Sequence, residues 1–388
     1  MEILSALECK YPSDCIYFSR KNSDYLGVGL YFLEDEQTQR RVGGVSIYNR
    51  KKIIDEFSRN PKTILTEDAS KPELFIDTES GVVNFEWDKF GSDFYTNNGY
   101  DHNCLNSSLE LITCLCSNKT IKYYSVDLKS SNYTLLNSIR SENVDDNNNI
   151  IGLDLSSVSV YGTKKTSYSI SDGRVFVIKD MEFIDTEFTA HDKTEVWTVS
   201  FLDNNHGNIL ATGGDDCVIS LWDLRTNSNS IYDGVIKNLN AHSMGVTCIE
   251  KYDCSQDHLF WSGSYDETLS LWDIRNFSVP IHKTNVGGGV WRISDLNYNG
   301  NSHFIGLALC YFGFKFYNIN ARSGINSLTE VASLPNESEN NDSIKHKSMV
   351  YGIDILHNYD NKSHNSVLSA TCSFYDNTII LSSVSLSN

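Results

Sequence analysis

The sequence predicts an all-β fold built from repeated sheets. Short runs of alternating Val, Ile, Leu, Tyr and Phe are separated by clusters of Gly, Asn, Asp and Ser, and patterns with a helical period are nearly absent. The 388 residues include 21 Tyr, 18 Phe and 6 Trp, which are residue types that favour strands. One sequence pattern also returns after about fifty residues, which indicates a repeat architecture.

The strongest repeat aligns residues 195–225 with residues 245–275. In both copies a Trp-Asp pair, beginning at Trp222 or Trp272, follows a turn that contains Gly and Asp and a loop that begins with Ala-His, at matching distances. This combination resembles the WD repeats of β-propeller proteins. A four-stranded blade of such a protein has two apolar faces, and stacking the blades in a ring buries them.

Five further segments repeat the pattern less closely and bring the predicted number of blades to seven. Weaker copies without the Trp-Asp ending cover residues 289–317 and 349–379, and degenerate blades are predicted at about 14–48, 81–126 and 150–178.

We therefore predict that residues 1–388 form one seven-bladed WD-repeat β-propeller, in which residues 190–278 hold the strongest repeats. The ring has to close, so residues 3–9 are expected to supply the outer strand of the last blade. The polar, Asn-rich segments at about 141–149 and 330–345 are predicted to be surface loops or insertions.

Composition limits the classes of partner. The net charge of −18, without a local basic stripe, disfavours nucleic acid and favours a cationic ligand or a basic protein surface. No stretch approaches the ~20 apolar residues of a membrane-spanning helix, and the start of the chain has no signal-peptide pattern. We expect a monomer in the cytoplasm, with nuclear presence left open.

The ten cysteines contain no CxxC pair, which argues against a disulfide framework or a zinc site. Several of them fall in strand-like runs, which suits buried thiols in a reducing compartment. These are Cys217, Cys248, Cys310 and Cys372. We expect no metal and no cofactor, because the sequence also has no Gly-x-Ser-x-Gly elbow, no His-Glu-x-x-His helix and no phosphate-binding glycine loop.

Two sets of four polar side chains match the WD-repeat pattern in which a hydrogen-bonded network crosses one blade. The sets are His191, Thr212, Asp216 and Trp222 in one blade, and His242, Ser262, Asp266 and Trp272 in the next. A Ser, a His and an Asp also suggest a catalytic triad. The structural interpretation explains the Trp as well, and we prefer it.

Alignment of the innermost strands places Trp197, Thr247, Trp291 and Tyr351 at the same position in four successive blades. Three of these residues are aromatic. In the same register, Glu195, Asp215, Tyr265 and Tyr375 fall where WD-repeat proteins commonly contact partners.

All of these side chains should converge on one mouth of the central channel. Aromatic rings beside carboxylates form a good receptor for a quaternary ammonium group. The alternative is that the rings only plug the channel.

A closer resemblance adds an activity. The motifs in residues 242–246, 263–267, 286–292, 313–315 and 370–376 resemble the WD-repeat diphthine methyl ester esterases of diphthamide biosynthesis. The resemblance covers about residues 190–385, and the first half matches only in blade layout. It implies hydrolysis of the methyl ester on a modified histidine of translation elongation factor two, with that factor as partner. The substrate carries a trimethylammonium group beside the ester.

The resemblance implies no catalytic assignment, so the following roles are our hypothesis. Glu195 or Asp215 would act as general base on a water molecule, and Arg292 or backbone N–H groups would stabilise the oxyanion. His242 is a second choice of base. Trp197, Tyr265, Trp291, Tyr351 and Tyr375 would bind the substrate.

Two non-catalytic functions remain open. Most WD-repeat propellers are scaffolds that dock other proteins. The chain could also be a substrate receptor for a ubiquitin ligase, because the Trp-Asp-x-Arg endings at Arg225 and Arg275 resemble motifs that bind ligase adaptors.

Overall fold

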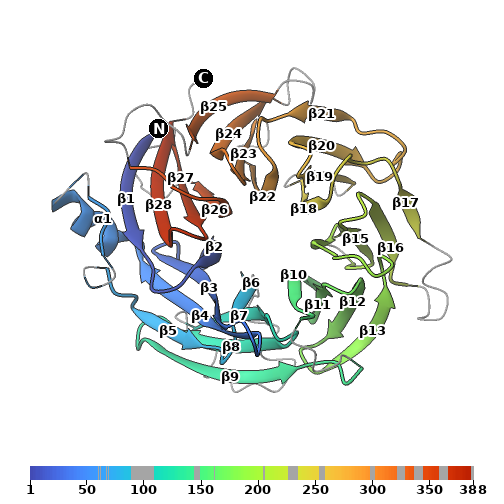
Figure 1. Ribbon diagram of the computed structural model, residues 1–388, viewed down its shortest axis with the longest axis horizontal. Coiled ribbons are helices and arrows are strands. Elements are labelled where there is room, and N and C mark those ends of the chain that lie inside the picture. Colours follow the sequence, from blue (N-terminus) through green and yellow to red (C-terminus); the bar gives the residue numbers. More distant parts are fainter. Residues whose placement is uncertain are drawn as a thin grey trace.

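The computed structural model describes most of the chain. The described residues are 1–59, 61, 63–66, 68, 70–88, 109–143, 149–160, 162–203, 206–225, 235–252, 258–297, 302–320, 328–335, 344–357 and 366–385. They form seven antiparallel four-stranded sheets arranged in a ring, as Figure 1 shows. The prediction of a seven-bladed WD-repeat β-propeller is confirmed.

The first three blades follow the order of the chain. Blade 1 contains β2 (Ser13–Phe18), β3 (Tyr25–Asp35), β4 (Arg40–Asn49) and β5 (Leu74–Asp77). Blade 2 contains β6 (Val82–Trp87), β7 (Leu109–Cys116), β8 (Ile121–Asp127) and β9 (Asn132–Ile139). Blade 3 contains β10 (Gly152–Val160), β11 (Thr163–Ile170), β12 (Arg174–Lys179) and β13 (Phe183–Thr189).

The next three blades hold the strongest repeats. Blade 4 contains β14 (Thr198–Phe201), β15 (Ile209–Gly213), β16 (Ile219–Asp223) and β17 (Ile236–Asn238). Blade 5 contains β18 (Val246–Lys251), β19 (Leu259–Ser264), β20 (Thr268–Asp273) and β21 (His282–Asn285). Blade 6 contains β22 (Val290–Asn297), β23 (Ser302–Leu309), β24 (Gly313–Asn320) and β25 (Leu328–Pro335).

Blade 7 joins the two ends of the chain. It contains β26 (Val350–His357), β27 (Ser366–Ser373) and β28 (Thr378–Ser385), and its outer strand is β1 (Glu2–Glu8). β1 runs antiparallel to β28, with Ala6 opposite Ile380 and Glu8 opposite Thr378. The prediction that the N-terminal strand closes the ring is confirmed.

The apolar core lies between the blades. One cluster, for example, joins Leu115 and Tyr123 of blade 2 to Leu155, Tyr168 and Phe176 of blade 3, all of them buried. Because neighbouring sheets share such clusters all round the ring, each blade depends on both neighbours for burial. This packing leaves the innermost strands around the channel and the outermost strands toward solvent (Figure 1).

A helix that the sequence analysis missed covers the outer edge of the closing strand. α1 (Arg50–Arg59) begins after Asn49, whose side-chain oxygen accepts hydrogen bonds from the backbone N–H groups of Lys51 and Lys52. The helix buries Ile53 and Phe57, and it packs against β1. An unpaired strand edge promotes association, and the helix shields this one.

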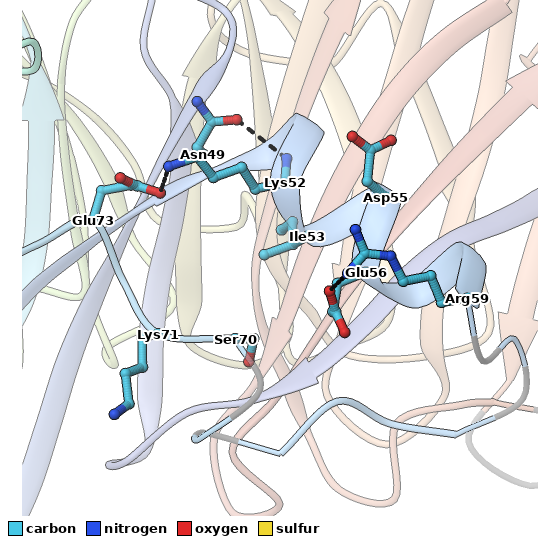
Figure 2. A pocket seen from close by; sticks show the side chains of 9 residues that line it. All are labelled: Asn49, Lys52, Ile53, Asp55, Glu56, Arg59, Ser70, Lys71 and Glu73. Carbon is cyan, nitrogen blue, oxygen red and sulfur yellow. Dashed lines mark hydrogen bonds and ion pairs between the residues drawn. The ribbon is translucent and has the colours of Figure 1, made fainter.

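A shallow surface pocket of about 330 Å³ lies between α1 and residues 70–73. Figure 2 shows that charged side chains surround it, with Lys52 paired to Glu73 and Arg59 paired to Glu56. Exposed ion pairs such as these contribute little to stability.

Three details differ from the sequence analysis. The degenerate blades predicted at 14–48, 81–126 and 150–178 contain the three inner strands of blades 1–3, but their short outer strands were not recognised. In the predicted insertion at 330–345, residues 330–335 belong to β25, and residues 336–343 lie outside the described part of the chain. In the predicted insertion at 141–149, residues 144–148 also lie outside the described part of the chain.

The cysteine prediction was also only partly correct. Cys248 and Cys372 are buried in strands, whereas Cys310 directly follows β23 and Cys217 lies half-buried in a turn with a φ of 67°. Among the described residues, no helix has the length and apolar character that crossing a membrane requires.

Replacing Leu7 in the closing strand by alanine tests the importance of ring closure. Leu7 is fully buried, so Leu7→Ala is expected to lower the free energy of unfolding by about 2–5 kcal/mol. The matched control is Leu135→Ala on the outer strand β9, where Leu135 is 47% exposed. It should change the free energy by no more than about 0.5 kcal/mol. Equal effects in urea titrations would contradict this account.

Candidate functional site

The innermost strands share one irregularity at the same end of the channel. In six of the described sheets the register between the first and second strand shifts at one residue near the start of the inner strand, as in a β-bulge. The residues skipped there are Asp14, Val83, Leu153, Thr247, Trp291 and Tyr351. In blade 4 the pairing begins at Thr198, so Trp197 directly precedes it. A bulge turns a side chain out of the regular alternation. Five of these residues are partly exposed, and we call this group the mouth: Asp14, Leu153, Trp197, Trp291 and Tyr351. Val83 instead packs into the core between blades 2 and 3.

Trp291 is the centre of an aromatic cluster at the mouth. The centroid of its ring lies 4.7 Å from that of Tyr351, 5.7 Å from that of Trp197 and 5.7 Å from that of Tyr265. All four side chains are partly exposed. The sequence analysis predicted that blades 4–7 bring these rings together, and the structure places them in contact. Thr247 differs, because it is buried and its hydroxyl donates to the carbonyls of Gly263 and Val290.

Two other candidate binding residues lie at the rim. The Asp215 carboxylate accepts a 3.2 Å hydrogen bond from the indole Nε1–H of Trp197, which fixes the orientation of that ring. The backbone N–H of Asp215 in turn donates to the carbonyl of Glu195, so both carboxylate residues are held beside Trp197. Tyr375 is 65% exposed and reaches the cluster through Phe374, whose ring lies 5.1 Å from that of Tyr351.

The glycine segment 287–289 allows blade 6 to approach blade 5 closely. Gly287 has a φ of 77°, and a Cβ at Gly289 would lie only 3.1 Å from the Tyr265 ring. Larger residues here would push Tyr265 away from Trp291.

A layer of polar side chains crosses the channel below the aromatic cluster. Arg292 donates a 3.0 Å hydrogen bond from Nη1 to Asp154, which lies on the opposite side of the ring in blade 3. Asp154 also accepts from the Asn84 amide at 2.6 Å, and Asn84 accepts from the Tyr17 hydroxyl at 3.0 Å. We call Tyr17, Asn84, Asp154 and Arg292 the polar layer. It forms the floor of the mouth.

Arg292 stays charged in this layer. Burial works to lower the pKa of Arg292, but the nearby Asp154, Tyr17 and Asp14 raise it further above its usual range. The guanidinium Nε of Arg292 is buried and has no hydrogen-bond partner among the described residues. The Nε–H of Arg292 is therefore a buried donor without an acceptor among the described residues.

Below the polar layer the channel widens into a cavity of about 620 Å³. Glu86 is one of its lining residues. Burial, and then the charge of Asp88, raise the pKa of Glu86 to about 7, although Lys164 and Ser157 oppose the shift. Arg20 and Asp354 form an ion pair of 2.8 Å on the wall of the same cavity.

The two predicted tetrads are hydrogen bonded. In blade 4, His191 contacts Asp216 and Thr212 at 2.9 Å, and the Trp222 indole donates to Thr212 at 3.0 Å. In blade 5, His242 contacts Asp266 at 3.1 Å and Ser262 at 2.7 Å, and the Trp272 indole donates to Ser262 at 2.8 Å. Both histidines are buried, and each network ties a loop between blades to the middle of its sheet.

The geometry of His242 favours the structural role over the catalytic one. Both ring nitrogens have partners, and the side chain has no exposed surface. Hydrogen bonds from His242 and Thr268 also lower the pKa of Asp266, against the effect of burial.

Blade 7 carries a related network that the sequence analysis missed. His346 contacts the Thr371 hydroxyl at 2.8 Å, and Asp376 accepts from the backbone N–H of Lys347. Burial lowers the pKa of His346 to about 4. The spacing from His346 to Asp376 was a usable signal, but blade 7 lacks the Trp-Asp pair that drew attention to the others.

Asp14 is a further site residue that the sequence did not reveal. Blade 1 lacks WD-repeat features, so nothing aligned Asp14 with Trp291 and Tyr351 at the mouth. Residues 13–16 (Ser-Asp-Cys-Ile) share only the final isoleucine with residues 350–353 (Val-Tyr-Gly-Ile), so the equivalence is visible only in the strand pairing.

The arginines of the two Trp-Asp-x-Arg endings lie on the outside of the ring. Arg225 and Arg275 each pair with the aspartate two residues earlier, Asp223 and Asp273, and both guanidinium groups remain largely exposed.

Comparison with known proteins agrees with this architecture. A family model described as "WD domain, G-beta repeat" matches residues 182–223 and 234–273. Over 374 residues the chain is 25% identical to the "Diphthine methyltransferase" of Schizosaccharomyces pombe, covering 96% of this chain and 94% of the relative. It is 27% identical to the "Diphthine methyltransferase homolog" of Dictyostelium discoideum, covering 94% and 95%. The chain is therefore similar to these two relatives over nearly its whole length. The resemblance seen in the motifs is thereby confirmed.

Other members match over a shorter stretch. The human "Diphthine methyltransferase" is 36% identical over 125 residues, which cover 32% of this chain and 25% of the relative. Among solved structures, a chain of "Crystal Structure of Mitotic Checkpoint Complex" aligns with a TM-score of 0.61 at 14% identity, covering 98% of this chain and 91% of that one. The Chaetomium thermophilum Raptor structure aligns with a TM-score of 0.65 at 12% identity, covering 100% and 29%. These two likenesses show the fold alone.

The tetrad of blade 5 offers a matched pair of serines. Ser262→Ala is expected to lower the free energy of unfolding by about 1–3 kcal/mol, because His242 and Trp272 both lose their partner. Ser270, directly opposite Ser262 on β20, is equally buried, but its hydroxyl has no partner among the described residues. Ser270→Ala should change the value by at most about 0.5 kcal/mol. Similar losses of stability for both variants in denaturant melts would contradict the structural role of this hydrogen-bonded network.

Proposed function

We propose that the protein hydrolyses the methyl ester of diphthine methyl ester on translation elongation factor two, giving diphthine and methanol. Similarity to relatives named diphthine methyltransferase supports a part in diphthamide biosynthesis. The direction of the reaction, hydrolysis rather than methyl transfer, is our proposal. The observation that carries it is the contact of Trp291 with Trp197, Tyr265 and Tyr351, next in the chain to Arg292, whose Nε–H has no acceptor among the described residues.

The aromatic cluster suits the trimethylammonium group of this substrate. A quaternary ammonium cannot donate a hydrogen bond, so its recognition depends on ring faces and nearby negative charge. The cluster supplies four partly exposed rings, and Asp215 supplies a carboxylate beside Trp197. The overall charge of −18 also favours a cationic group over an anionic one.

Arg292 suits the ester end of the substrate. When water attacks an ester carbonyl, negative charge develops on the carbonyl oxygen, and a positioned donor stabilises it. The unpartnered Nε–H of Arg292 is such a donor, and the Asp154 contact keeps the guanidinium in place. Trimethylammonium and ester share one carbon in the substrate, so the two subsites have to be neighbours, as the mouth and its floor are.

Purified protein and elongation factor two carrying the methyl ester test the proposal directly. Hydrolysis predicts methanol release in stoichiometric excess over the protein, with no requirement for a methyl donor. A methyltransferase would instead transfer label from S-adenosylmethionine and release no methanol. A scaffold or a ligase receptor would bind the factor in a fixed ratio and convert nothing.

Substitution of Trp291 tests the binding of the cation. Trp291→Leu removes the ring, and a cation–π contact is worth about 0.5–2 kcal/mol, so KM should rise about two- to thirtyfold with little change in kcat. Trp291→Phe retains a ring, so its KM should lie between the KM of the wild type and that of Trp291→Leu. The control is Phe183→Leu on the outer strand β13, where the ring is half-exposed and remote from the mouth. Equal KM values for Trp291→Leu and the wild type would contradict the aromatic receptor.

Single substitutions of Arg292, Asp215 and Glu195 test the polar groups. Arg292→Lys is expected to lower kcat about a hundredfold or more, because lysine lacks the second fixed donor that faces the oxyanion. Asp215→Asn should mainly raise KM by weakening the hold on Trp197, and Glu195→Gln should act in the same direction. Wild-type rates of methanol release for all three variants would rule out this site.

A further inference from the structure

We propose that Asp14, on the inner strand of blade 1, is the general base that takes a proton from the attacking water during ester hydrolysis. This inference rests on the proposed function and assigns the one role that the aromatic cluster and Arg292 leave unfilled. Asp14 lies at the same position in its blade as Tyr351 does in blade 7 and Trp291 in blade 6. Its carboxylate therefore belongs to the mouth.

The backbone around Asp14 is fixed on both sides. The Pro12 carbonyl accepts a 3.0 Å hydrogen bond from the backbone N–H of Tyr31, and the Ser13 hydroxyl donates to the Ser373 carbonyl in blade 7 at 3.1 Å. After Asp14, regular pairing resumes at Cys15, which lies opposite Gly29. The strand therefore holds Asp14 firmly beside the neighbouring blade.

The side chain of Asp14 is left unengaged by this framework. It has no hydrogen-bond partner among the described residues, although Arg292, Asp154 and Tyr351 lie close enough to interact with it electrostatically. Burial raises the pKa of Asp14 to about 7, with Arg292 acting against the shift and Asp154 adding to it. A carboxylate held in this way is a stronger base than an exposed one, and it is largely ionised at slightly alkaline pH.

Asp14 is better placed for the base than the carboxylates at the rim. Asp215 is already an acceptor for the Trp197 indole, and it lies at the outer edge of the mouth. Asp14 lies close enough to Arg292 for the two charges to interact. The attacking water has to reach the ester carbonyl carbon close to the donor that stabilises the oxyanion. The general base and that donor therefore have to lie close together.

The reaction balances with these groups. Asp14 accepts a proton from water as the water oxygen forms a bond to the ester carbon, and the carbonyl oxygen becomes an oxyanion facing Arg292. When the oxyanion collapses, the bond to the methoxy oxygen breaks, and protonated Asp14 returns the proton to that oxygen. Methanol leaves, and the new carboxyl group loses its own proton to solvent.

Glu86 offers an unusually close control. It is a second channel carboxylate with a pKa raised to about 7 by burial, but it lies beyond the polar layer in the lower cavity. The other titratable groups that face Asp14 are Arg292 on β22, Asp154 on β10, Tyr351 on β26, Cys372 on β27 and Cys15 on its own strand. The pKa values of the two thiols and of Tyr351 are raised well clear of neutrality. Glu86→Gln therefore tests a carboxylate of raised pKa that lies away from the mouth; the pKa of Asp88 in the same cavity is also raised by burial, but Asp88 is paired with Lys164.

The experiment measures methanol release from methyl-esterified elongation factor two between pH 5.5 and 8.5 for the wild type, Asp14→Asn and Glu86→Gln. In the wild type, kcat is expected to rise with pH as a single group ionises near pH 7. Asp14→Asn should lower kcat at pH 8 by about a hundredfold or more, with KM changed by less than about threefold, and should abolish the rise. Glu86→Gln should keep both the rate and the profile.

Stability measurements separate a catalytic role from a structural one. A carboxylate whose pKa is higher in the folded state than in the unfolded state destabilises the fold as pH rises from about 4 to above 7. Asp14→Asn should therefore melt at a higher temperature than the wild type at pH 8, and the difference should vanish toward pH 4. Should Asp14→Asn fail to fold, Asp14→Glu keeps the charge but moves it by one methylene group, and is expected to lose at least about tenfold in kcat.

The outcomes are distinct. No methanol release by the wild type overturns the proposed function and this inference together. Turnover by the wild type with an unchanged kcat and pH profile in Asp14→Asn overturns only the role of Asp14. A rise in KM with kcat retained also overturns it, because Asp14 would then only bind the cation.

Discussion

Pairing of β1 with β28 is the constraint on which the rest of the structure depends. The two strands come from opposite ends of the chain, and their hydrogen bonds fix the seventh blade against the first. In an open row of blades the terminal sheets would expose apolar faces, and the inner strands would not surround a channel. The position of every mouth residue follows from this closure. Asp14 and Tyr351 are distant in sequence, yet closure makes their blades neighbours.

The polar layer adds a second constraint that the strand pairing alone does not provide. Arg292 and Asp154 are 138 residues apart and meet across the channel. A buried ion pair is costly to desolvate, and removing one partner leaves the other charge uncompensated. In this protein the pair is supported by Asn84, which donates to the Asp154 carboxylate, and by Tyr17, which donates to Asn84. With Arg292, these residues connect blades 1, 2, 3 and 6. We infer that the layer separates the mouth from the lower cavity.

What the sequence could predict depended on repetition. Blades 4 and 5 carry complete tetrads, so their sequences could be aligned residue by residue. Alignment of the inner strands then identified Trp197 and Trp291 as neighbours at the channel. The closing strand was predictable because a ring of seven sheets has to be completed. These features follow from local patterns and from one topological requirement.

The features that could not be predicted depend on contacts between blades. Blade 1 has no tetrad, so no sequence motif aligned Asp14 with Tyr351. The partners of Arg292 become visible only when opposite sides of the ring are placed together. The raised pKa values of Asp14 and Glu86 result from burial, which a sequence pattern does not measure. α1 was missed because a single short helix covers one strand edge and leaves little periodic signal.

The bulges of the inner strands have a consequence for how such a protein can change over time. The bulges at Asp14, Trp291 and Tyr351 each deliver one side chain to the opening while the flanking residues keep their ladder pairing. Exchanging the residue at such a bulge therefore changes the side chain that one blade presents at the opening. The strand pairing of that blade stays intact. Valine, leucine, threonine, aspartate, tyrosine and tryptophan all occupy such positions in this one chain. These six positions allow the same fold to present different side chains around its channel through a few substitutions.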